Sequence, residues 1–207
     1  MVIKRAFRHI IFIPIIAMMF IAGCAGSPPS RFYTMNPLDA ADTTGKNISQ
    51  GNAVIVAVGP VHIPDYLDRP QIVTRTGRNE LTLAEFDRWP GSLKLDIVRV
   101  MLDNLSIILH EQQISVVAWK SAIPFECRVA VDISAFDVYL NDHVILKANW
   151  VLYDKDGKKV VAMKDASYRE PVNGNDYNAA VAAMSKCLIS LSRGVAETIK
   201  GVVYQGK

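Results

Sequence analysis

The stretch that decides the fold is residues 125–163, which read FECRVAVDISAFDVYLNDHVILKANWVLYDKDGKKVVAM. Apolar side chains occupy every second position over residues 127–133 and again over residues 144–152, a spacing typical of half-buried β-strands. The apolar parity of the first strand shifts by one residue at Phe136, which predicts a β-bulge or a strong local twist. Asp154-Lys155-Asp156-Gly157 is a hairpin signal, so we expect a further strand from Lys158 to Met163.

Upstream of this stretch, shorter apolar runs predict the remaining strands. We expect strands at Arg31–Met35, Ala53–Val58, Gln71–Arg75, Glu80–Leu83 and Ile114–Trp119. The continuous β-branched run at Ala53–Val58 is typical of a central strand that is buried on both faces. Thr76-Gly77-Arg78-Asn79 separates two of these runs and indicates a hairpin.

Two amphipathic helices complete the pattern. The first is expected from an N-cap at Ser92 to about Glu111, with its apolar face formed by Leu95, Val98, Leu102, Leu105 and Leu109, widened by Ile97, Met101 and Ile108. The second is expected to begin at a cap on Asn175 or Asp176, with an apolar seam formed by Val181, Met184, Leu188, Leu191, Val195, Ile199 and Val202. The sequence therefore predicts a single α+β domain in which two main helices pack on a mixed, mostly antiparallel sheet.

The N-terminus has the layout of an export signal. Lys4, Arg5 and Arg8 precede an apolar run from Ile10 to Ile21, and Ile21-Ala22-Gly23-Cys24 resembles a bacterial lipobox. We therefore expect a signal peptide at 1–23, a lipidated tether at 24–30 with lipidation at Cys24, and a folded domain at 31–207. The alternative is an uncleaved signal anchor, although the apolar run is shorter than the roughly 20 residues that span a bilayer.

The charge balance argues against nucleic-acid binding. The chain has 23 Lys and Arg against 20 Asp and Glu, but residues 1–23 contain three of the bases and no acid. The remaining chain is therefore neutral, and its Lys and Arg residues do not cluster into the basic face that nucleic acid requires.

No motif of the sequence signals catalysis or a bound cofactor. His62, His110 and His143 lack the spacing of metal ligands, and there is no nucleotide-binding loop or nucleophile motif, so we expect neither an enzyme nor a metal site. Cys127 and Cys187 lie on apolar faces, which leaves two alternatives. They form a disulfide in an oxidising envelope, or they are two buried free cysteines.

Residues 58–105 carry a family resemblance. They include Pro64-Asp65-Tyr66-Leu67-Asp68-Arg69-Pro70-Gln71, then Glu85-Phe86 and Trp89, and finally Asp103-Asn104-Leu105. Together with Tyr33 and Asp176-Tyr177, this pattern resembles the ABC-type transport auxiliary lipoprotein family, the PqiC-like proteins, over nearly all of residues 24–203. The resemblance implies a subunit of an intermembrane lipid transport system that partners an MCE-type periplasmic protein. It also implies an anchor in the inner leaflet of the outer membrane, facing the periplasm, and Ala25 after the cysteine is similar to lipoproteins exported there.

The loop in this resemblance is the candidate docking surface. Proline-restricted backbone, a rigid Tyr66 and the forked donors of Arg69 suit partner binding, so we predict a site at Pro64, Asp65, Tyr66, Leu67, Arg69 and Trp89. The structural alternative is that the aromatic and apolar side chains cap a sheet edge while Asp65 and Arg69 shape a turn. Two functions follow. The first is a non-catalytic, lipid-anchored docking subunit, as a single copy or as a ring of identical copies, and the second is a lipid- or ligand-binding lipoprotein that works alone.

Overall fold

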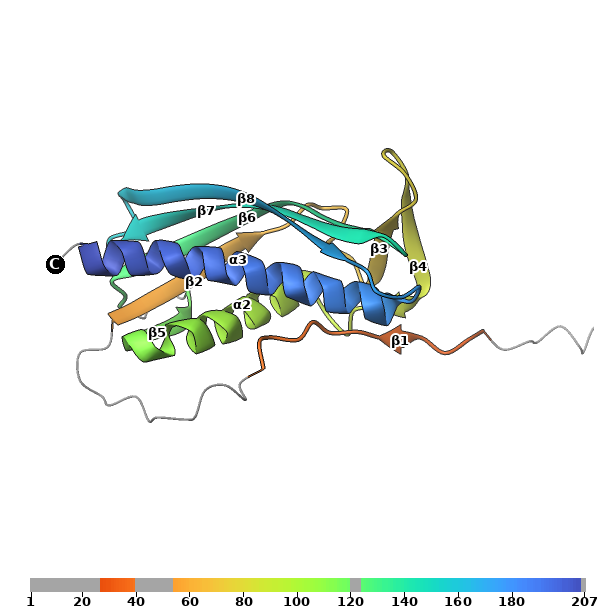
Figure 1. Cartoon of the computed structure of the whole chain (residues 1–207), viewed down its shortest axis with the longest axis horizontal. Coiled ribbons are helices and arrows are strands. Elements are labelled where there is room, and N and C mark those ends of the chain that lie inside the picture. The colour runs from red at the N-terminus through yellow and green to blue at the C-terminus, as the bar shows by residue number, and fades with distance from the viewer. Residues whose placement is uncertain (1–26, 40–53, 120–123, 206–207) are drawn as a thin grey trace, which may run out of the picture.

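The computed structural model describes residues 27–39, 54–119 and 124–205 (Figure 1). In chain order the elements are β1 (Arg31–Phe32), β2 (Val54–His62), β3 (Gln71–Arg75), β4 (Leu81–Arg88), α2 (Leu93–Leu109), the 3-10 turn η2 (His110–Gln112), β5 (Ile114–Ala118), β6 (Cys127–Tyr139), β7 (His143–Asp154), β8 (Val160–Pro171) and α3 (Tyr177–Gln205). The strands form a five-stranded sheet in the order β5-β2-β6-β7-β8 and a three-stranded sheet in the order β1-β4-β3. The predicted α+β class is confirmed, with the strands divided between two sheets.

The five-stranded sheet follows the sequence pattern closely. The central strand β2 pairs in parallel with β5 and β6, whereas β6, β7 and β8 form a long antiparallel meander. The predicted irregularity in β6 is confirmed, because Ile133 pairs with Ala148 and Ala135 with Lys147, which leaves Ser134 as an extra residue. This bulge lets both apolar sets of β6 point into one core.

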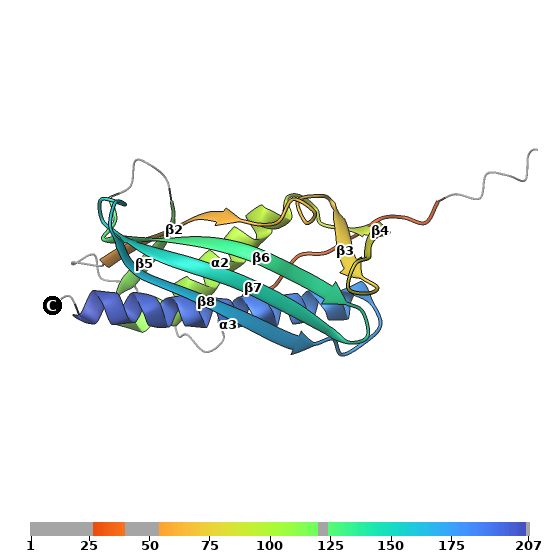
Figure 2. The same ribbon diagram turned by 90° about the horizontal axis from the view of Figure 1, so that it is seen from above.

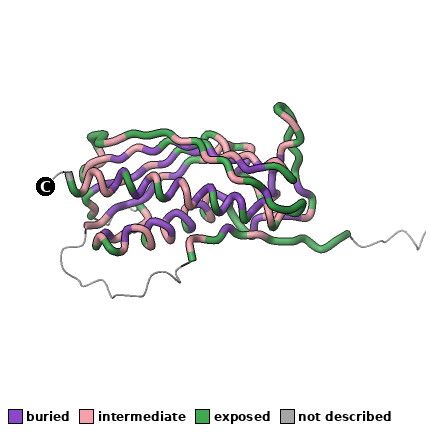
Figure 3. The backbone as a smooth tube through the Cα atoms, in the orientation of Figure 1, coloured by how far each residue is buried: buried purple, intermediate pink, exposed green. Residues whose placement is uncertain are grey.

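Both helices lie on the same face of the large sheet (Figure 1), and Figure 2 shows the opposite face of that sheet turned toward the viewer. The predicted seam of α3 is confirmed, since Val181, Met184, Leu188, Leu191, Val195 and Ile199 are all buried. By length and composition α3 could cross a membrane, but 61% of its most apolar window is buried inside the domain, as expected for a core helix. Figure 3 shows the buried positions gathered between the helices and the sheet.

The predicted face of α2 is confirmed over most of its length, since Ile97, Met101, Leu105 and Leu109 are buried and Val98, Leu102 and Ile108 pack against the core, but it is wrong at Leu95. Leu95 is 68% exposed, and the buried stripe consists of Leu93, Ile97, Val100, Met101, Asn104, Leu105 and Leu109. The N-caps agree with the sequence: Ser92 Oγ accepts from the Leu95 amide at 3.4 Å, and Asp176 Oδ1 accepts from the Ala179 amide at 2.8 Å. The helix therefore starts where expected, and its buried stripe differs from the prediction by losing Leu95 and gaining Leu93, Val100 and Asn104.

Several predicted boundaries shift. The opening strand β1 is limited to two residues, β2 continues through Pro60 to His62, β4 extends to Arg88, and β8 extends to Pro171. The signal peptide at 1–23 and the lipidation site Cys24 lie outside the described residues.

The disulfide considered for Cys127 and Cys187 is not formed, and both cysteines are free and buried. Cys127 pairs in register with Asp154 at one end of β7, whereas Cys187 lies against Glu170, which pairs with Val144 at the other end. Ten residues of extended strand separate these positions by about 33 Å. A disulfide needs Cα atoms within about 7 Å of each other, so the alternative of two small buried side chains applies.

Candidate functional site: a rigid loop, a helix-start pocket and a clamped N-terminal segment

The candidate docking loop connects β2 to β3 through a tight turn. The Leu67 amide donates to the Pro64 carbonyl at 2.9 Å, and the Asp68 amide donates to the Asp65 carbonyl at 3.2 Å. The Leu67 side chain is buried in the core, so the loop is fixed from inside. Its backbone is therefore held in one conformation by hydrogen bonds and by a buried anchor.

Tyr66 is half-buried and engaged within the domain. Its hydroxyl donates to Asp137 Oδ1 at 2.8 Å, and the Arg75 guanidinium lies 5.7 Å from the centre of its ring. Arg75 Nε also lies 2.8 Å from Asp137 Oδ1. Burial, followed by the hydrogen bond to Asp137, raises the pKa of Tyr66, so the phenol keeps its proton and this three-residue cluster ties the loop to β3 and β6.

The six predicted site residues therefore separate into two groups. Leu67 and Trp89 are each only 3% exposed, and the Trp89 amide donates to the Pro70 carbonyl at 2.7 Å, so both side chains support the loop as in the structural alternative. Asp65 is exposed, and Pro64, Tyr66 and Arg69 are partly exposed. The surface available to a partner is formed by these four residues.

Arg69 carries an unpaired donor. Its Nε atom is buried and has no hydrogen-bond partner among the described residues. Leaving a buried donor unpaired costs free energy, so such a group calls for an explanation. The rest of the guanidinium is partly exposed, so its terminal donors are the part of Arg69 that a carboxylate or phosphate oxygen from outside would contact.

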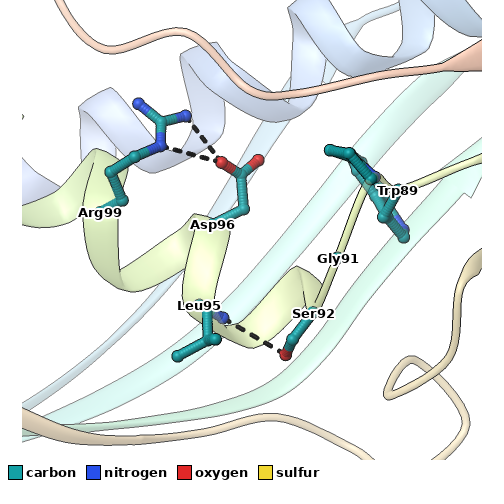
Figure 4. Close-up of a pocket in the computed structure, with 7 residues that line it drawn as sticks. Trp89, Gly91, Ser92, Leu95, Asp96 and Arg99 are labelled. Atoms are coloured by element: carbon teal, nitrogen blue, oxygen red, sulfur yellow. Dashed lines mark hydrogen bonds and ion pairs between the residues drawn. The ribbon is translucent and has the colours of Figure 1, made fainter.

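A pocket of about 320 Å³ opens at the start of α2, close to the loop (Figure 4). It is lined by Trp89, Pro90, Gly91, Ser92, Leu95, Asp96 and Arg99. Asp96 and Arg99 form an ion pair at 2.6 Å on one side, and the exposed Leu95 forms an apolar rim on the other. The sequence analysis missed this pocket because it assigned Leu95 to the buried face; the turn signal Trp89-Pro90-Gly91-Ser92 was the available hint.

The N-terminal segment is clamped to the domain through Asp87. Arg31 contacts the Asp87 carboxylate through Nε at 2.8 Å and Nη2 at 3.0 Å, and the Tyr33 hydroxyl donates to the same carboxylate at 2.7 Å. Burial and the bond to Asp87 raise the pKa of Tyr33 to about 12. The clamp therefore keeps its hydrogen bonds throughout the physiological pH range.

The same segment continues across both helices. Met35 is fully buried, its amide donates to Asp96 Oδ2 at 2.9 Å, and its carbonyl accepts from Arg99 at 2.7 Å. The amide of Asn36 donates to Ser185 Oγ at 3.1 Å, and that of Leu38 donates to Asn104 Oδ1 at 2.7 Å. Residues 31–38 therefore form a strap bound to β4, α2 and α3.

The described residues offer no metal centre. Over residues 27–39, 54–119 and 124–205, no group of three or more His, Cys, Asp and Glu side chains is arranged to hold a metal ion. His62 is exposed, and His143 lies 2.8 Å from Asp142 and 3.0 Å from Arg169 through Nδ1. The features that stand out in the described part of the chain are the rigid loop, the pocket at the start of α2 and the strap of residues 31–38.

Comparison with known proteins gives the family. The model of the ABC-type transport auxiliary lipoprotein component family matches residues 33–196, so this chain belongs to that family. It is 26% identical over 137 residues to the intermembrane transport lipoprotein PqiC of Escherichia coli K12, a match that covers 66% of this chain and 71% of the relative. The Shigella flexneri protein of the same name matches to the same extent.

Solved structures share the fold. An uncharacterised protein superposes with a TM-score of 0.69 at 16% identity, over 83% of this chain and 99% of that one. A Xanthomonas campestris protein superposes with a TM-score of 0.58 at 18% identity, over 86% of this chain and 94% of that one. At these identities the likeness supports the α+β architecture alone.

Proposed function

We propose that this protein is a non-catalytic, lipid-anchored auxiliary subunit of an MCE/ABC-type intermembrane lipid transport system. In this role it docks the periplasmic MCE-type component at the outer membrane, from an anchor at Cys24 in the inner leaflet. The observation that carries the proposal is the family match over residues 33–196, together with the PqiC relatives. The lipobox-like sequence before Cys24 supplies the anchor.

The partner contact is assigned to the loop and the adjoining pocket. The loop is rigid, so it loses little conformational entropy when a partner binds. Arg69 offers a partly exposed guanidinium, and Leu95 offers an exposed apolar side chain beside a pocket. An acidic residue flanked by apolar ones on the partner would match both features.

Arg69→Lys tests this assignment. Lysine keeps the charge and most of the aliphatic stem, but it loses the planar fork of donors and Nε itself. The matched control is Arg193→Lys, at an exposed position on α3. After gentle detergent extraction, Arg69→Lys should recover much less of the MCE-type protein than the control at equal thermal stability; equal recovery would remove Arg69 from the interface.

The anchor has its own test. Metabolic labelling with radioactive palmitate should mark the protein, and Cys24→Ser should abolish the label and release the protein from the membrane. An unlabelled wild-type protein with an intact N-terminal Met1 would contradict the anchor. Assembly into a ring of identical copies is part of the proposal, and the mass of the detergent-extracted particle measures the copy number.

One observation favours the second function, a lipoprotein that binds lipid or another ligand without a partner. A cleft of about 370 Å³ lies on the sheet face opposite the helices, lined in part by His62, Arg128, Asp132 and Tyr153. The Arg128 guanidinium lies 4.6 Å from the Tyr153 ring and 5.0 Å from the Trp119 ring, and no described carboxylate forms an ion pair with it. A bound phospholipid without a partner in the same extraction would favour this function.

A further inference from the structure

The strap determines which end of the domain is nearest to the lipid anchor. Residues 31–38 are held by the contacts of Asp87, Asp96, Ser185 and Asn104, so the chain leaves the folded body at Arg31. Six residues lie between Cys24 and Arg31, and the seven Cα-to-Cα steps that join the two reach at most about 25 Å when fully extended. If Cys24 is lipidated, as the proposed function requires, the bilayer surface lies within that reach of β1.

The three-stranded sheet β1-β4-β3 forms one end of the molecule. Figures 1 and 2 both show β1, β3, β4 and the start of α3 at one end, with the C-terminus of α3 and the β7–β8 turn at the other. Strand β8 runs along this axis from Val160 to Pro171. Its eleven residue steps correspond to about 36 Å, so the two ends stand at clearly different distances from the anchor.

The three-stranded sheet β1-β4-β3 carries three exposed apolar side chains. Phe32 on β1 is 63% exposed, and Leu81 and Leu83 on β4 are 39% and 45% exposed. Phe32 pairs with Arg88 next to the place where the tether enters, and the two leucines lie toward the other end of β4. The start of β8, at the far end of the molecule, carries three more exposed apolar side chains. Exposed apolar residues alone therefore do not distinguish the two ends; the tether does, and the side chains on β1-β4-β3 suit an apolar partner there.

We propose that the β1-β4-β3 sheet rests on the bilayer that holds the lipid anchor, with Phe32, Leu81 and Leu83 in the headgroup region. The occupant is lipid because the anchor brings a bilayer to this end of the domain and the short tether keeps it there. Interfacial elements of this kind sit about 5–10 Å into the boundary between headgroups and acyl chains. The domain then stands upright, with the β7–β8 turn farthest from the membrane.

A depth measurement tests the orientation. Leu83→Cys and Val160→Cys are each labelled with a maleimide-linked bimane dye in the acylated protein, which is then bound to phosphatidylcholine and phosphatidylglycerol vesicles containing brominated acyl chains. Val160 is the matched control because it is 52% exposed and lies at the far end of β8. Cys127 and Cys187 are buried, so the unsubstituted protein should take up no dye.

The expected result is that bromine quenches about half of the fluorescence at position 83, as for a probe at interfacial depth, and leaves position 160 unchanged. The protein must float with the vesicles for the comparison to be made, and flotation supports the lipid anchor. If quenching is then equal at both positions, or stronger at position 160, the proposed orientation is wrong although the anchor is retained. If the mature protein has the mass of an unacylated chain and fails to float with the vesicles, then Cys24 is not a lipid anchor, and the proposed orientation is wrong as well.

Discussion

Gly194 makes a testable packing prediction because α3 approaches β7 and β8 most closely there. A Cβ atom added at Gly194 would lie 2.7 Å from the Tyr168 hydroxyl and 3.3 Å from the Trp150 ring. The Trp150 ring cannot easily withdraw, since it is 3% exposed and its Nε1 donates to Thr198 Oγ1 at 3.1 Å. The glycine is thus needed for close packing of the helix on the sheet.

Two effects of Gly194→Ala oppose each other. Alanine in a helix interior is favoured over glycine by about 0.5–1 kcal/mol. Overpacking a well-filled core typically costs about 1–3 kcal/mol. The Tyr168 hydroxyl is the end of a partly exposed side chain and can move aside, but the buried Trp150 ring must also give way by a few tenths of an ångström. Because both must shift together, we expect the clash to dominate, with a net loss of about 1 kcal/mol in the free energy of unfolding and a fall in Tm of about 2–4 °C for a domain of this size.

Urea unfolding of Gly194→Ala, Gly201→Ala, Tyr168→Phe and the double variant of Gly194→Ala with Tyr168→Phe measures both the helix preference of alanine and the cost of the clash. Gly201→Ala is the matched control, because a Cβ there meets nothing within 4 Å and should stabilise the helix by up to about 1 kcal/mol. Tyr168→Phe removes the oxygen that a new Cβ would strike, so Gly194→Ala should cost less in that background than in the wild type. If Gly194→Ala stabilises the protein as Gly201→Ala does, or loses the same free energy with Phe at position 168, the packing argument is refuted.

Three further predictions concern buried groups. Burial raises the pKa of Cys127 to about 11 and of Cys187 to about 12 from the ordinary 9.0, so the folded state holds these protons more tightly than the unfolded chain. The free energy of unfolding should therefore lose this contribution as pH rises from about 9 to 12 in urea titrations, and Cys127→Ser with Cys187→Ser should flatten that decline. Met35→Ala should cost about 2–5 kcal/mol, because the fully buried side chain joins the strap to the core; an unchanged urea midpoint would show that it does not. Thr198→Val should cost about 1–3 kcal/mol by leaving Trp150 Nε1 without an acceptor, and a neutral result in the same titration would contradict that hydrogen bond.

The β-meander was predictable from sequence because its pairing is local. Alternation in β6 and β7 and the turn at Asp154–Gly157 specify neighbouring antiparallel strands, and the parity shift at Phe136 specifies a bulge. The division into two sheets was not predictable in this way. It depends on β1 pairing with Asp87 and Arg88, more than fifty residues away, through a run of only two residues.

The sequence places the candidate site on one stretch of chain, but it does not tell which of the residues in that stretch reach the surface. Aromatic and apolar side chains in a rigid loop serve equally to fill a core or to bind a partner, and composition does not distinguish the two uses. Leu67 and Trp89 are buried because the loop folds back onto the domain, whereas Asp65 and Arg69 remain at the surface. Only the tertiary contacts of the folded domain determine which residues of the loop are buried and which are exposed.

The strap explains why the buried stripe of α2 includes Asn104, a polar residue that the apolar pattern omitted. An irregular segment that crosses two helices cannot pair with a strand, so the amides of Met35, Asn36 and Leu38 take their acceptors from side chains. Asn104 is fully buried within the apolar stripe of α2 for this reason, and it also donates to Ser192 of α3 at 3.3 Å. A purely apolar periodicity passes over such a residue and admits an apolar but exposed one, such as Leu95. A buried amide on a helix face is therefore informative, because it marks the place where a third segment crosses, and here that segment is the strap of residues 31–38.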